Sequence, residues 1–153
     1  MTRSDIAIAD RLVRRRARML VFFAMYFMAS QGIYFGKMEK WDEWGRLRTI
    51  DAVQISAWFA MALALLVLLF TGGGWFRSRA VRSLMNDEGT RDNRRKALAI
   101  AFANTMAMGF TIYFLSLFKP VSAREAVYMM MTVGIGSALL AFGMAERRAL
   151  RDG

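Results

Sequence analysis

Residues 126–145 read AVYMMMTVGIGSALLAFGMA, an apolar stretch in which no residue carries a charge. Glu125 stands directly before this stretch, and the charged run Glu146-Arg147-Arg148 follows it. About 20 residues of α-helix cross the roughly 30 Å hydrocarbon core of a bilayer. The length of the stretch and its charged ends therefore predict a transmembrane helix.

Three further stretches have the same character: 19–36, 52–72 and 97–118 also contain no charged residue. The chain has 153 residues, and its 22 Lys and Arg and 12 Asp and Glu all lie between or outside the four stretches. The stretches lack the alternating pattern of barrel strands, and any other lipid-spanning segment must be helical. The sequence therefore predicts a single all-α membrane domain, a bundle of four transmembrane helices with a loop at about 73–96.

The basic residues are distributed unequally between the two ends of these helices. The N-terminus, the 73–96 loop and the C-terminus hold most of them, and the opposite side holds only Lys37, Lys40, Arg46, Arg48, Lys119 and Arg124. Cytoplasmic segments next to transmembrane helices are enriched in Lys and Arg. We therefore expect both termini and the 73–96 loop to face the cytoplasm.

The two halves of the chain share short matches. Arg15-Arg16 and Ile33-Tyr34-Phe35 in the first half correspond to Arg94-Arg95 and Ile112-Tyr113-Phe114 in the second. Duplication of a helical hairpin would explain these matches, and so would the chance similarity of two apolar sequences. If the hairpin is duplicated, the halves are parallel repeats about an axis along the membrane normal.

The composition excludes several kinds of chemistry. The chain has no His and no Cys, so it lacks the usual protein ligands of zinc, haem iron and iron–sulfur clusters, and it cannot form Ser-His-Asp or Cys-His sites. Its 13 Met include residues that could bind Cu(I), but flexible apolar packing is the commoner role of Met. We expect no catalytic residue, no metal and no cofactor, and hence no enzyme.

Polar groups inside the four stretches are uncharged. The absence of a carboxylate there argues against a proton-coupled transporter, which normally needs one within the membrane. Gln31, Gln54 and Asn104 are the main candidates for intramembrane polar contacts. They would either form hydrogen bonds between helices or line the polar path of a small transporter or channel.

Small residues recur at four-residue spacing in the 97–118 stretch, at Ala99, Ala103 and Ala107. Such spacing places small side chains on one helix face and lets two helices approach closely in a membrane. We expect this face to pack within the chain, and the alternative is the seam of a homodimer.

A short segment before the third stretch mixes both signs of charge. It contains Asp87, Glu88, Arg91, Arg94 and Arg95. Positive charge alone would explain the orientation of the chain, so the acidic residues favour either a solvated segment with internal ion pairs or a docking surface for a cytosolic protein. We expect no direct contact with nucleic acid, because the cytoplasmic location already accounts for the basic residues.

The local signals for helix ends are clearest in the second half. Pro120 should end the third helix, and Ser122 with Glu125 three residues later forms the pattern of a capping box at the start of the fourth. Thr90 is the predicted N-cap of the third helix.

Over about residues 80–150 the chain resembles a group of uncharacterised small bacterial four-span inner-membrane proteins. The resemblance rests on Asn86-Asp87-Glu88, Arg91 and Asn93-Arg94-Arg95 before a span, on Ser122-Ala123-Arg124-Glu125-Ala126 opening the last span, and on Glu146-Arg147-Arg148 closing it. Some members of this group are paired with helix-turn-helix regulators. The resemblance implies a location in the bacterial inner membrane and a soluble transcription factor as the partner.

The sequence as a whole favours a non-enzymatic accessory or regulatory membrane protein, embedded in the lipid bilayer, which docks a cytosolic regulatory protein through the mixed-charge segment. One alternative is a small transporter or channel with a polar path between its helices. Another is a structural subunit of a larger membrane complex.

Overall fold

A computed structural model describes residues 3–38, 49–71 and 88–152 of the chain. Within these ranges all regular secondary structure is α-helical, which confirms the predicted all-α class. The helices are α1 (Arg3–Met38), α2 (Thr49–Thr71), α4 (Glu88–Ser116) and α5 (Ala123–Asp152).

The start of α5 is fixed by the predicted capping box. The backbone N–H of Ser122 donates to Glu125 Oε2 at 2.9 Å, and the backbone N–H of Glu125 donates to Ser122 Oγ at 3.3 Å. Two backbone donors at the helix start are thereby satisfied by side chains of the same turn. The preceding helix ends at Ser116, before Pro120, as the sequence predicts.

The start of α4 differs from the prediction. The helix begins at Glu88, so residues 88–96 are helical and do not belong to a loop, and Thr90 lies inside the helix and is not its N-cap. Asp92 and Lys96, four residues apart, form an exposed ion pair at 2.6 Å between Oδ2 and Nζ. Oppositely charged side chains at this spacing stabilise a helix. The third span is predicted from uncharged residues alone, so the prediction leaves out these charged turns of the helix.

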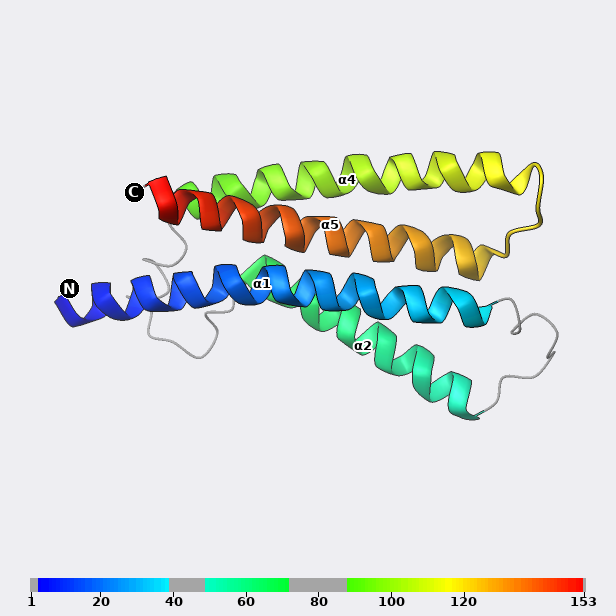
Figure 1. Cartoon of the computed structure of the whole chain (residues 1–153), viewed down its shortest axis with the longest axis horizontal. Helices are drawn as coiled ribbons and strands as arrows, with labels where there is room; N and C mark the ends of the chain where they lie inside the picture. The colour runs from blue at the N-terminus through cyan, green and yellow to red at the C-terminus, as the bar shows by residue number, and fades with distance from the viewer. Residues whose placement is uncertain (1–2, 39–48, 72–87, 153) are drawn as a thin grey trace.

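Helix α5 is the element against which the others pack. It contacts α4 and α1 along much of their length and α2 more sparingly, while α2 diverges from α1 toward its own N-terminal end (Figure 1). The largest buried apolar side chains come from three helices: Leu20, Phe27, Leu69, Leu139 and Phe142. The first residues of α1 and α4 and the last residues of α5 lie at the same end of the molecule (Figure 1).

Among the described residues, two helical segments are long and apolar enough to cross a membrane, Glu88–Ser116 and Ala123–Arg151, and the part of α2 over Ile55–Thr71 is apolar but shorter. Much of their apolar surface is uncovered: Phe102 and Phe110 each expose 66% of their area, and Phe114 exposes 61%. An apolar surface of this kind is unfavourable in water and favourable in lipid. These features support membrane association.

Glycines in α5 permit the close approach of α1. A Cβ atom at Gly143 would lie 2.8 Å from Val21 Cγ2 and 3.1 Å from the backbone nitrogen of Val21, and one at Gly136 would lie 2.7 Å from Met28 Cγ. Real Cβ atoms essentially never lie within 3.0 Å of another heavy atom, so a side chain at either glycine would require a displacement. The two helices therefore pack with backbone against side chain, the mode in which small residues allow helices to associate in membranes.

The alanines of α4 that are buried against other helices are not the predicted ones. Ala99, Ala103 and Ala107 are exposed, whereas Ala97 and Ala101 are buried. The expectation that the Ala99–Ala107 face packs within the chain is therefore wrong. Since α4 has small residues on more than one face, their spacing alone does not identify the face that packs, and the homodimer seam stays a prediction.

Candidate functional site

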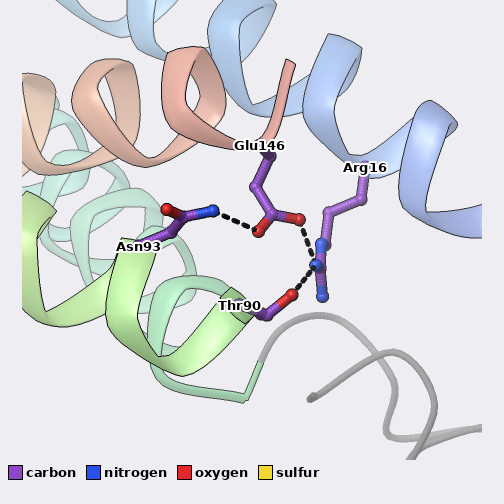
Figure 2. A network of polar contacts seen from close by, with 4 residues as sticks. All are labelled: Arg16, Thr90, Asn93 and Glu146. Carbon is purple, nitrogen blue, oxygen red and sulfur yellow. Dashed lines mark hydrogen bonds and ion pairs between the residues drawn. The ribbon is translucent and has the colours of Figure 1, made fainter. Parts of the chain in front are cut away.

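A buried polar cluster connects three helices at the end of the molecule where α4 begins. Figure 2 shows its four members: Arg16 from α1, Thr90 and Asn93 from α4, and Glu146 from α5. Arg16 is 7% exposed and Glu146 is 3% exposed, so the charges of both lie away from solvent. We refer to these four residues as the Arg16–Glu146 cluster.

The hydrogen bonds of the cluster satisfy both oxygens of the carboxylate. Nη2 of Arg16 donates to Oε2 of Glu146 in an ion pair and lies 3.4 Å from Thr90 Oγ1 (Figure 2). Nδ2 of Asn93 lies 3.4 Å from Oε1, the second carboxylate oxygen of Glu146. Ion pairs removed from water need such additional hydrogen bonds to offset the desolvation of the two charges.

The position of Arg16 follows from the buried stripe of α1. Leu20, Ala24, Phe27 and Gln31 recur at steps of three or four residues and are all buried, and Arg16 lies four residues before the first of them. In a helix this spacing places all five on one face. Arg16 therefore points toward α5 as the apolar residues of its stripe do.

The aromatic ring of Phe142 supports the guanidinium of Arg16. Phe142 is fully buried, and Cζ of Arg16 lies 5.6 Å from the centroid of its ring. A cation over an aromatic face is attracted by the quadrupole of the ring. Glu146 lies four residues after Phe142 on the same face of α5, so one turn of this helix supplies both the ring and the carboxylate.

The sequence does not predict this cluster. Its charge pattern places Arg16 among the basic residues of the N-terminus and Glu146 in the charged run that ends the last span. The signal that could have found them is periodicity, since Arg16 continues the stripe of Leu20 and Phe27, and Glu146 continues that of Leu139 and Phe142. Charge alone does not distinguish a solvated boundary residue from a buried one.

A second polar contact lies at the other end of the stripe of α1. Gln31 is 1% exposed, its Oε1 accepts a hydrogen bond from the hydroxyl of Tyr128 in α5, and its Nε2 donates to Ser30 Oγ at 3.0 Å. The ring of Tyr128 packs on that of Trp58 in α2, with 4.9 Å between the ring centroids. Gln31 thus participates in an interhelical contact that joins α1 and α5 and reaches α2.

The other two predicted intramembrane residues are not part of this contact. Gln54 belongs to α2, but its side chain lies outside the described residues. Asn104 is exposed on α4. The structure therefore does not bring Asn104 together with the buried Gln31.

The residues predicted to dock a partner separate into two groups. Glu88, Arg91 and Arg95 are exposed on the first turns of α4, where their spacing of three and four residues places them on one face. Arg94 is half-buried, and its Nη1 donates to the carbonyl oxygen of Phe70 in α2 at 2.6 Å. Asp87 lies outside the described residues.

Comparison with protein-family models, with curated proteins and with solved structures found no match to this chain.

In the part of the chain that the structure describes, no three acidic side chains come together in a way that could hold a metal ion. The Arg16–Glu146 cluster consists of an ion pair with hydrogen-bonding neighbours, and each group of the pair already contacts another side chain. Such an arrangement can fix three helices relative to one another. Its immediate effect is to hold the first turns of α4, which carry the exposed charges.

Proposed function

We propose that the chain is a non-enzymatic, integral accessory or regulatory protein of the bacterial inner membrane that docks a cytosolic protein on the first turns of α4. In this proposal it has four spans, and both termini and the start of α4 face the cytoplasm. The docking surface consists of Glu88, Arg91 and Arg95, and we call it the α4 face.

The observation that carries the proposal is the position of the α4 face beside a buried ion pair. Thr90 and Asn93, which contact Arg16 and Glu146, lie between the three exposed charges in the same two turns of α4. A charged surface on a fixed helix loses less conformational entropy on binding than one on a mobile loop. Mixed charges on such a surface favour partner choice and orientation more than affinity.

The proposed topology is supported by the exposed apolar surface of the helices and by the distribution of basic residues. It can be tested cleanly because the chain has no Cys. Single variants Phe118→Cys and Arg148→Cys replace an exposed residue in the turn between α4 and α5 and an exposed residue near the C-terminal end of α5. We expect a membrane-impermeant maleimide to label Phe118→Cys in intact spheroplasts and to label Arg148→Cys only after lysis. The reverse pattern would contradict the proposed orientation.

The docking proposal is tested by crosslinking in cells from Arg91→Cys, with a cysteine-reactive photocrosslinker. We expect an adduct with a soluble protein, identified by mass spectrometry, that is lost in the additional double reversal Glu88→Lys/Arg95→Glu. The reversal leaves the net charge of the segment unchanged, so the charge bias that orients the chain is preserved.

A matched control reverses the neighbouring pair, Asp92→Lys/Lys96→Asp, which also leaves the net charge unchanged and alters an ion pair already formed. We expect this control to retain the adduct. Equal loss in both double variants, or no soluble adduct from Arg91→Cys, would refute docking on the α4 face. An adduct with another membrane protein would instead indicate a subunit of a larger membrane complex.

A further inference from the structure

An open apolar groove runs along α5 between α4 and the C-terminal half of α2. Its volume is about 470 Å³. Leu69 of α2 and Leu98 of α4 lie on its two walls, and Val127, Gly134 and Ala138 mark its course along α5. A groove of this kind, on a surface that the proposed topology places in lipid, is suited to an apolar chain.

The groove is long enough for much of an acyl chain. From Val127 to Ala138 the floor rises about 16.5 Å, at roughly 1.5 Å per helical residue. Leu69 and Leu98 extend the lining toward the end at which α4 begins. The groove can therefore accommodate much of a phospholipid acyl chain that lies parallel to the helices and enters from that end.

Close approach of the helices forms the floor of the groove. A Cβ atom at Gly134 would lie 2.6 Å from Thr105 Oγ1, and both residues line the groove. The hydroxyl of Thr105 donates to the carbonyl oxygen of Ala101 in its own helix at 2.8 Å, which satisfies its hydrogen. The groove thus presents methylene and methyl groups and very little polar surface.

Arginines lie at the cytoplasmic end of the groove. Arg94 stands one helical turn before Leu98, and its Nη1 donates to the carbonyl oxygen of Phe70, the residue after Leu69. Arg16 and Arg91 lie close enough to Arg94 to repel its charge, and Glu146 lies close enough to attract it. Since Arg16 and Glu146 form an ion pair with each other, Arg91 and Arg94 contribute positive charge at this end.

We propose that the groove binds one acyl chain of an anionic phospholipid, whose phosphate lies against Arg91 and Arg94. Guanidinium groups bind phosphate with paired hydrogen bonds, and basic residues near a membrane surface attract anionic lipids. A zwitterionic lipid offers the same acyl chain, but its cationic group opposes the arginines. The proposal rests on the membrane topology proposed above.

The test uses the full chain purified in a mild detergent and native mass spectrometry. Phosphatidylglycerol and phosphatidylcholine with identical acyl chains are added at equal concentration. We expect retention of one phosphatidylglycerol molecule at concentrations at which phosphatidylcholine is lost. Equal retention of the two lipids would refute the role of the arginines.

Two pairs of variants locate the bound lipid. Arg91→Gln should weaken phosphatidylglycerol binding about fivefold, while Arg148→Gln, which removes an exposed arginine near the C-terminal end of α5, should not change it. Leu98→Trp places a larger side chain in the groove and should abolish retention, while Ile100→Trp, at an exposed position outside the groove, should not. Retention unaffected by Leu98→Trp would refute the groove as the site.

Two further measurements test whether the site binds phosphate without an acyl chain and whether the chain is inserted in the membrane. Inorganic phosphate should not displace phosphatidylglycerol, and full displacement would indicate an anion site without an acyl chain. Alkaline carbonate extraction of cell membranes tests insertion independently of lipid selectivity. If the chain is extracted, the proposed membrane topology fails; if it resists extraction and shows no lipid selectivity, only the lipid site fails.

Discussion

Arg16 and Glu146 form a buried ion pair across 130 positions of sequence, joining the first helix of the chain to the last. The side chains are 6% and 3% exposed, and Thr90 and Asn93 add contacts from a third helix. A pair of this kind is costly to desolvate and costs more still to break, because the remaining charge has no partner. The pair therefore adds a specific contact between α1 and α5 to their apolar packing, and Thr90 and Asn93 extend it to α4.

Removing the carboxylate should destabilise the fold strongly. In Glu146→Ala the buried guanidinium of Arg16 loses its counter-ion, and we expect the free energy of unfolding to fall by about 3–5 kcal/mol. The measurement is denaturant-induced unfolding of the purified chain in detergent micelles, followed by tryptophan fluorescence.

The double variant Arg16→Met/Glu146→Met separates the pair from its isolated charges. Apolar replacement of both members of a buried ion pair is often neutral or stabilising. We expect the double variant to unfold at a higher denaturant concentration than Glu146→Ala. If it is as unstable as the single variant, the ion pair is not what makes Glu146 important for stability.

Close packing between α1 and α5 gives a second prediction. Gly143→Ala places a methyl group 2.8 Å from Val21 Cγ2 and 3.1 Å from a backbone nitrogen that cannot turn aside. Overpacking of this kind typically costs about 1–3 kcal/mol. We expect the free energy of unfolding to fall by that amount in the same assay.

Gly109→Ala is the matched control for Gly143→Ala. A Cβ atom at Gly109 would lie 3.4 Å from Met130 Cε, the end of a flexible side chain. Alanine is favoured over glycine in a helix interior by about 0.5–1 kcal/mol. We expect this variant to be as stable as the parent chain or slightly more stable, and equal destabilisation by both alanines would contradict the packing described for Gly143.

The features that the sequence predicts correctly depend on neighbouring residues. The apolar helices and the capping box of Ser122 and Glu125 are encoded within one or a few turns, so local patterns suffice to find them. The pairing of Arg16 with Glu146 depends on how α1 and α5 are rotated and how closely they approach, and neither follows from local composition. The exposure of Asn104 and of Ala103 has the same origin, because a helix that is apolar on several faces does not specify which face packs.

The capping box itself gives a third prediction. In Ser122→Ala the side-chain acceptor for the backbone N–H of Glu125 is lost, and we expect the free energy of unfolding to fall by about 0.5–2 kcal/mol. Ser116→Ala is the control, because the hydroxyl of Ser116 only donates to the carbonyl oxygen of Tyr113 in its own helix. If the two variants are equally stable, the box does not contribute to the start of α5.

The contact between Gln31 and Tyr128 gives the last prediction. Tyr128→Phe removes the hydroxyl that donates to Gln31 Oε1 and retains the ring that packs on Trp58. Since Gln31 is 1% exposed, its carbonyl oxygen loses a partner that water cannot readily replace, and interhelical hydrogen bonds in membranes contribute about 0.6–2 kcal/mol. We expect the unfolding free energy to fall within this range. Tyr113→Phe, which removes a hydroxyl from a tyrosine that is 63% exposed, should have no effect. Equal stability of Tyr128→Phe and the parent chain would show that this hydrogen bond does not hold α1 against α5.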